Sequence, residues 1–165
     1  MRSRLVRILF ERGGLLGLAV AALYLAIAPA HVIDGDNAEF CTLGALGGAG
    51  HPPGYPLFVL WLRAMSWLPG ASPAHTAALA TALLGALSIV VLHAACRAWG
   101  ARPLAATLAC AIYAGAPVVI AIYTEAEVFA LNGVIVGGVL LLAARGGPLR
   151  GTWRAGALGL VAGLG

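Results

Sequence analysis

Long apolar runs are the feature that most restricts how this chain can fold. Residues 13–30, 75–96, 103–123 and 128–144 contain no Asp, Glu, Lys or Arg. A helix of about 20 apolar residues, rising about 1.5 Å per residue, matches the hydrocarbon thickness of a bilayer. Only 10% of all residues are charged, whereas ordinary soluble domains carry about a quarter. The sequence therefore predicts an all-α, polytopic transmembrane protein in which these four runs are spans.

Both ends of the chain carry a further expectation. Ala28-Pro29-Ala30 loosely resembles the A-x-A cleavage site of a secretory signal peptide. The first apolar run is longer than a typical signal core of about 7–15 residues, which favours an uncleaved span. Residues 155–165 are apolar and too few to cross a bilayer. We expect another span to start there, so that residues 1–165 form the N-terminal part of one multi-spanning domain whose C-terminal part is missing.

The predicted outer loop, residues 31–74, contains an apolar segment at 55–69 that is interrupted by Arg63. This segment is too short to span comfortably, and Trp61 and Trp67 are residue types enriched at membrane interfaces. The sequence thus predicts an interfacial helix on the outer face, after the first span.

The distribution of charge supports this topology. If 55–69 does not cross and the amino terminus is cytoplasmic, every arginine except Arg63 lies inside, and every acid except Glu11 lies outside. This arrangement follows the positive-inside rule. Because the arginines are spread between apolar blocks, we expect the lipid bilayer as a partner and no nucleic acid. The expected location is the bacterial cytoplasmic (inner) membrane, with the acidic loops extracytoplasmic.

The acids of the outer loop stand close together in "GDNAE". Asp36 and Glu39 are three residues apart, so they share one face if a helix begins here. Two interpretations stay open. Asp36 could be a helix N-cap with Glu39 at N3, a capping box. Alternatively, one carboxylate accepts a proton from an attacking hydroxyl, or helps to hold a divalent metal ion.

Two further motifs lie in the predicted outer regions. "HPPGYPL" contains three prolines and a glycine, which predict a rigid turn in which an X-Pro bond can be cis. His51 of this motif is either a hydrogen-bonded structural group or a contact for a phosphate or a substrate hydroxyl. In "AEVFALN", Glu127 suits the N-terminus of a helix, and Asn132 needs a polar partner deeper on that helix.

In this order and spacing, "GDNAE", "HPPGYPL" and "AEVFALN" resemble the protein O-mannosyltransferase-like membrane glycosyltransferase family, whose members have the GT-C fold. The resemblance extends from about residue 20 to residue 145. It implies transfer of a sugar, mannose by the family label, from a polyprenyl-phosphate carrier. The acceptor would be a hydroxyl on a protein or glycan at the extracytoplasmic face.

The resemblance also implies site residues. Asp36 is expected to be the catalytic base, with Glu39 in a supporting catalytic role. The expected substrate-binding residues are Asp34, His51, Tyr55, Arg63, Glu127 and Asn132.

A departing phosphate needs a positive partner. The sequence leaves this partner open between Arg63, a protonated histidine, a metal ion held by the acids, and an arginine elsewhere in the protein. Two other functional classes also stay open. A transporter would place ionisable groups inside the spans, where His93 is the main example. A non-catalytic membrane scaffold would use the acids only as helix caps and would tolerate Asp36→Asn.

Overall fold

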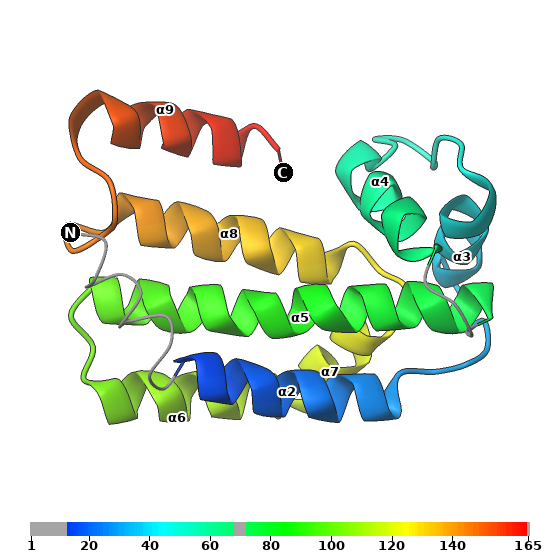
Figure 1. The fold of residues 1–165 in the computed structure, drawn as a ribbon, viewed down its shortest axis with the longest axis horizontal. Coiled ribbons are helices and arrows are strands. Elements are labelled where there is room, and N and C mark those ends of the chain that lie inside the picture. The colour runs from blue at the N-terminus through cyan, green and yellow to red at the C-terminus, as the bar shows by residue number, and fades with distance from the viewer. Residues whose placement is uncertain (1–12, 68–71, 165) are drawn as a thin grey trace.

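The structure is a computed structural model that describes residues 13–67 and 72–164 (Figure 1). All regular elements of this part are helices, which confirms the all-α prediction. In chain order the helices are α2 (Gly14–Ile27), α3 (Asn37–Leu46), α4 (Pro56–Met65), α5 (Pro73–Ala98), α6 (Pro103–Ala114), α7 (Pro117–Thr124), α8 (Phe129–Ala143) and α9 (Gly151–Ala162).

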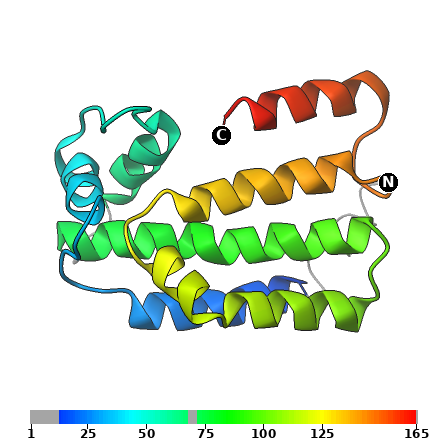
Figure 2. The ribbon, with the colours of Figure 1, turned by 180° about the vertical axis from the view of Figure 1, so that it is seen from behind.

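Helix α5 is the centre of the arrangement. It packs most extensively against α8 on one side and α2 on the other, and α6 and α7 also contact it (Figures 1 and 2). The pair α3 and α4 packs together at the end where α5 begins. The outer segment predicted as 55–69 therefore contains α4, which rests on α3 and α5. Pro69 of that segment lies outside the described residues.

The limits of α5 follow from local chemistry. Ser72 caps its first turn, since the hydroxyl oxygen accepts a hydrogen bond of 3.2 Å from the backbone N–H of His75. Pro73 suits the first helical position, where no intrahelical donor is needed. Beyond the C-terminus, Gly100 adopts a positive φ of 97°. In the described part of the chain, α5 is the one unbroken helix long and apolar enough to cross a membrane.

The run at 103–123, predicted as a span, is divided into two helices. Helices α6 and α7 meet at a bend of 70°. Pro117 explains the break, because it has no N–H to donate and its ring clashes with the preceding turn. The freed carbonyl oxygen of Ala114 accepts a 2.8 Å hydrogen bond from the Tyr24 hydroxyl. Counted as one bent span, this pair is a second candidate for crossing a membrane.

The remaining predicted spans coincide with helices α2, α8 and α9, but these helices are shorter than a bilayer-spanning helix. Helix α2 has 14 residues and α8 has 15, so each extends about 21–23 Å against a hydrocarbon core of about 30 Å. Helix α9 begins at Gly151, ahead of the predicted residue 155. The crossing of these three helices stays a prediction. Glu11 and the arginines before the first run lie outside the described residues.

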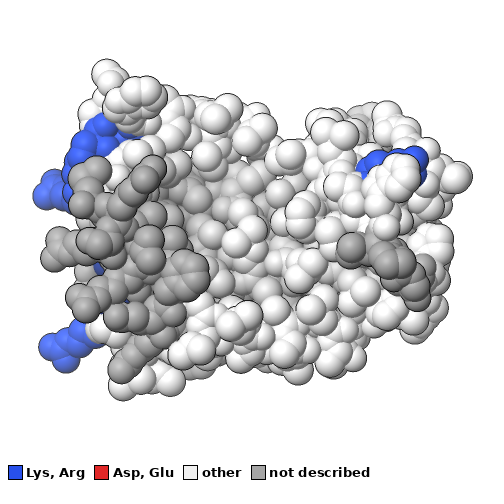
Figure 3. Space-filling view, in the orientation of Figure 1, with Lys and Arg blue, Asp and Glu red and all other residues white. Residues whose placement is uncertain are grey.

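Charge is separated along the helix axes. The arginine end lies where α5 and α8 finish and α6 and α9 begin, and Figure 3 shows basic atoms concentrated there. A smaller basic patch appears at the opposite end (Figure 3), where α4 carries Arg63. The residues of the arginine end are Arg97, Arg102, Arg145, Arg150 and Arg154. The opposite, acidic end carries Asp34, Asp36, Glu39, Glu125 and Glu127, around the start of α3 and between α7 and α8.

Candidate functional site

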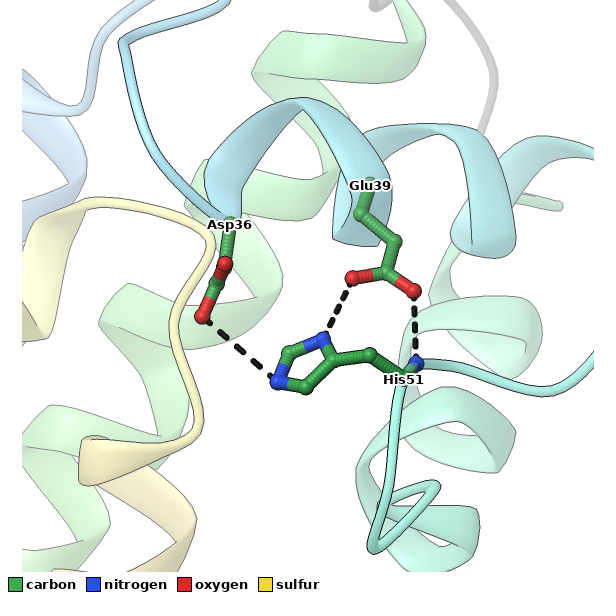
Figure 4. A group of neighbouring side chains, drawn as sticks. All are labelled: Asp36, Glu39 and His51. Atoms are coloured by element: carbon green, nitrogen blue, oxygen red, sulfur yellow. Dashed lines mark hydrogen bonds and ion pairs between the residues drawn. The ribbon is translucent and has the colours of Figure 1, made fainter.

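The start of α3 directs two carboxylates toward the loop that precedes α4. Gly35 makes the turn into the helix with a φ of 82°. Buried Asn37 secures this turn, because its side-chain oxygen accepts a 3.0 Å hydrogen bond from the N–H of Ile33. Asp36 and Glu39 then follow with helical spacing, and both face His51 (Figure 4).

The capping-box interpretation of these acids is wrong. Asp36 stands at the N-cap position with helical backbone angles (φ −70°, ψ −12°), and its side chain makes no capping hydrogen bond. Glu39 does not return to the backbone of Asp36. Both oxygens of Glu39 are used by a residue of the next loop instead.

That residue is His51, and with Asp36 and Glu39 it forms the carboxylate–imidazole cluster. The Oε1 atom of Glu39 accepts a 2.7 Å hydrogen bond from the backbone N–H of His51. The imidazole Nδ1 lies 2.6 Å from Oε2 of the same carboxylate. On the other side of the ring, Nε2 lies 3.7 Å from Oδ2 of Asp36 (Figure 4). The imidazole is therefore bracketed by two carboxylates, one held tightly and one at ion-pair distance.

This geometry shifts the proton affinities of the pair in opposite directions. Hydrogen bonds from the side chain and backbone of His51 lower the pKa of Glu39, because they stabilise its charged form. The hydrogen bond with Glu39 is also the main cause that raises the pKa of His51. The negative charges of Asp36 and Glu127 add to this effect. The pair thus favours a protonated imidazole beside an ionised Glu39.

Aromatic side chains support the cluster from one side. The ring of Tyr55 packs edge-on to that of His51, with 5.4 Å between the centroids. Buried Phe40 contacts both rings and also packs on buried Phe58, at 5.1 Å. The predicted cis X-Pro bond of this turn is confirmed at Pro52–Pro53. Phe40 and Phe58 were not predicted from the sequence. Their positions directly after the motifs "GDNAE" and "HPPGYPL" could have indicated that they lie near the site.

Glu127 approaches the cluster from the connection between α7 and α8. It precedes the N-cap Val128, so it lies outside the first turn of α8, where it was expected to cap the dipole. Burial raises the pKa of this carboxyl group, and the charges of Asp36 and Glu125 raise it further. Asp34, by contrast, is an exposed residue of the turn before α3.

An apolar groove of about 390 Å³ opens next to the cluster. It lies between the start of α4 and the start of α8, with the end of α9 closing one side. Its lining includes Pro53, Tyr55, Phe58, Val128, Leu131 and Asn132. Tyr55 and Asn132, both expected to bind substrate, therefore line one hollow, and Tyr55 also touches the cluster.

Arg63 lies elsewhere. Its guanidinium donates a hydrogen bond to the backbone carbonyl of Ala45 and stands 5.8 Å from the ring centre of Trp67. It lines a separate hollow of about 320 Å³ between α3, α4 and α5. The structure thus does not bring Arg63 to the carboxylate–imidazole cluster.

The cluster also has the composition of a metal site. Asp36, Glu39 and His51 each offer a ligand atom, and these atoms lie within 4.8 Å of one another. Carboxylate oxygen and imidazole nitrogen suit a divalent ion such as Mn²⁺ or Zn²⁺. However, both oxygens of Glu39 already accept hydrogen bonds from His51. An ion that used Glu39 would have to replace these bonds.

An all-α fold in which one or two of the described segments are apolar enough to cross a membrane is consistent with the broad class of helical membrane proteins. Residues 36–147 match the family model described as "Protein O-mannosyl-transferase TMEM260 N-terminal domain", and the chain belongs to this family. The expected relationship to protein O-mannosyltransferases is thereby confirmed. The match includes "HPPGYPL", "AEVFALN" and all of "GDNAE" except its first residue, Gly35.

A mouse relative (Mus musculus), the protein O-mannosyl-transferase TMEM260, is 30% identical over 128 residues. The aligned region covers 77% of this chain but 18% of the mouse protein. The chain therefore spans less than a fifth of the length of this relative. No solved structure matches the chain significantly.

Proposed function

We propose that this chain belongs to an integral-membrane glycosyltransferase with a polytopic, GT-C-like arrangement of helices. The enzyme moves a sugar, with mannose as the first candidate, from a polyprenyl-phosphate carrier to a hydroxyl of a protein or glycan. The observation that carries the proposal is the carboxylate–imidazole cluster of Asp36, Glu39 and His51. Membership in a family named for O-mannosyl transfer supports the choice of reaction.

Asp36 is the catalytic base in this proposal. Its side chain is 58% exposed, and one of its oxygens faces His51. Asp36 therefore remains accessible to an acceptor, whereas the oxygens of Glu39 are occupied. The carboxylate of Asp36 takes the proton of the acceptor hydroxyl while the acceptor oxygen bonds to the anomeric carbon of the sugar. The bond from that carbon to the phosphate oxygen breaks, and its electron pair leaves with the carrier phosphate.

The charge separation supports an orientation for the reaction. A cytoplasmic arginine end and an extracytoplasmic acidic end satisfy the positive-inside rule. The cluster then faces the compartment in which a lipid-linked sugar and a secreted acceptor meet. We place the protein in the bacterial cytoplasmic membrane in this orientation.

The test follows label from a polyprenyl-phosphate sugar into protein or glycan, in membrane vesicles that contain the natural protein. Asp36→Asn is expected to abolish transfer at equal expression and membrane insertion. Glu125→Gln is the matched control, because it removes a carboxylate from the same end outside the cluster. It is expected to retain transfer.

The other outcomes separate the alternatives. Transfer that persists in Asp36→Asn would move the base to Glu39 or Asp34. Absence of transfer in the unmodified protein, with several sugars, would favour a transporter or a membrane scaffold over a glycosyltransferase.

A further inference from the structure

We propose that His51 binds the phosphate of the lipid carrier at the mouth of the apolar groove, and that Glu39 is a positioning residue that holds the imidazole there. This inference rests on the proposed function and assigns one contact within it. It chooses among the positive partners that the sequence left open.

The groove lies beside the carboxylate–imidazole cluster. Tyr55 lines the groove and packs against the His51 ring at 5.4 Å. On the opposite wall, Val128 lines the groove. It directly follows Glu127, whose negative charge contributes to the raised pKa of His51. An apolar hollow whose wall residue Tyr55 packs on a charged group suits an amphiphile with one charged head. The imidazolium makes an anionic head the complementary choice, and the apolar walls accept an isoprenoid chain.

The imidazole of His51 is held in one orientation. Glu39 occupies Nδ1 at 2.6 Å and the backbone N–H at 2.7 Å, which fixes the ring against rotation. The atom left to meet a ligand is Nε2, which lies 3.7 Å from Asp36. A phosphate of the sugar donor that accepts a hydrogen bond from Nε2 would then lie beside the proposed base, Asp36, as transfer requires.

Arg63 is a poor alternative for this contact. Its guanidinium is engaged by the carbonyl of Ala45 and by the face of Trp67, and it lines the other hollow. Binding the same phosphate would require Arg63 to leave both partners. His51 needs no such rearrangement.

His51 also suits the way in which charge moves during transfer. When Asp36 takes the acceptor's proton, its carboxylate becomes neutral, and the breaking sugar–phosphate bond places a second negative charge on the phosphate. His51 lies next to both positions, so its positive charge stays paired throughout. Among the described residues, the charged groups that act on His51 are Glu39 of α3, Asp36 at its N-cap and Glu127 from the α7–α8 connection. All are acidic, and they favour the protonated imidazole that this role needs.

The experiment compares the affinities of the detergent-solubilised natural protein for polyprenyl phosphate and for neutral polyprenol, with inorganic phosphate in a third arm. Unmodified protein is expected to prefer polyprenyl phosphate to polyprenol. His51→Gln should weaken binding of polyprenyl phosphate by roughly 10- to 100-fold, the range for a hydrogen bond between charged groups. Binding of polyprenol should not change. Inorganic phosphate is expected to bind weakly, because it cannot use the groove.

Further variants separate a phosphate contact from a structural role. His51→Arg keeps a positive charge and is expected to restore part of the preference, while Glu39→Gln should give an intermediate loss. His31→Gln is the matched control, since His31 is an exposed histidine at the same end and outside the cluster. In transfer assays, His51→Gln is expected to raise the KM for the lipid donor and leave the KM for the acceptor unchanged.

Two results would overturn the assignment: an unchanged preference for the phosphate in His51→Gln, or an equal loss in His51→Gln and His51→Arg. Failure of the proposed function looks different. If the protein binds polyprenyl phosphate through His51 but transfers no sugar, the assignment of His51 stands and the proposed glycosyltransferase function is wrong.

Discussion

Glu39 and His51 are joined by two hydrogen bonds, one through the backbone and one through the side chain of the histidine. The two residues are twelve positions apart, and the contact closes the loop between α3 and α4. One carboxylate therefore fixes the path of the loop and also the orientation of the ring. The charge state of the cluster depends on this pair.

Replacing Glu39 with Gln is expected to lower the pKa of His51. The hydrogen bond with the Glu39 carboxylate is the largest cause of the raised value, and a neutral amide stabilises the imidazolium less. The sign follows directly: the raised pKa extends the protonated form to higher pH, so losing the carboxylate moves deprotonation to lower pH. Titration of the imidazole by NMR in detergent measures this change.

The same titration has an internal reference. His31→Gln removes an exposed histidine outside the cluster and should leave the His51 titration in place. A His51 pKa that is equal in the unmodified protein and in Glu39→Gln would show that the carboxylate does not control the ring. In the unmodified protein, binding of polyprenyl phosphate should fall as the pH rises through the pKa of His51.

Removing the Tyr24 hydroxyl is expected to destabilise the break between α6 and α7. Tyr24 is fully buried, and its hydroxyl satisfies the carbonyl of Ala114 that the bend leaves free. Tyr24→Phe retains the ring and leaves that carbonyl without this donor, at a cost of about 1–3 kcal/mol. Thermal unfolding in detergent, monitored by circular dichroism, should show a lower midpoint. An unchanged midpoint would mean that the hydroxyl is not needed at the bend.

The sequence predicted the helices that follow from long apolar runs. The runs at 13–30, 75–96 and 128–144 lie close to α2, α5 and α8, because uninterrupted apolar residues leave the backbone few other ways to pair its polar groups. At 103–123, counting apolar residues did not show the break that Pro117 introduces. The hydrogen bond from Tyr24 to the carbonyl of Ala114 at this break spans 90 residues, and no local pattern contains it.

The site was predictable in part for the same reason. Helical spacing correctly placed Asp36 and Glu39 on one face, since that is a local property. Their shared partner could not be found locally, because the loop path that brings His51 back passes through Gly47 and Gly48 at positive φ. Arg63 was expected at the substrate, but the helical turn of α4 directs it to Ala45.

Close approach between helices depends on glycine at several positions of α5 and α8. Gly137 of α8 lies close to α5, since an added Cβ would lie 3.1 Å from Val91. A sharper test is Gly85 of α5, where the added Cβ would lie 2.9 Å from the Cβ of Tyr123. That atom is fixed to the backbone of α7 and cannot rotate away.

Gly85→Ala is therefore expected to separate α5 from α7 and to destabilise the fold by about 1–3 kcal/mol, as overpacking does. Gly159→Ala is the matched control, because a Cβ there meets nothing within 4 Å. In a helix this control should be neutral or slightly stabilising. Equal unfolding midpoints for the two variants would contradict the close contact between Gly85 and Tyr123.

Removal of divalent metal ions is expected to leave sugar transfer intact. Glu39 uses both oxygens on His51, and the surrounding carboxylates favour a protonated imidazole, which has no lone pair to give to an ion. If His51 supplies the positive charge at the phosphate, no metal ion is required there. Transfer should thus be equal in vesicles treated with EDTA and in vesicles to which Mn²⁺ is then restored. Activity that disappears with EDTA and returns with Mn²⁺ would instead place an ion between Asp36 and His51, and Glu39→Gln would then weaken the response to Mn²⁺ because the ring loses the partner that orients it.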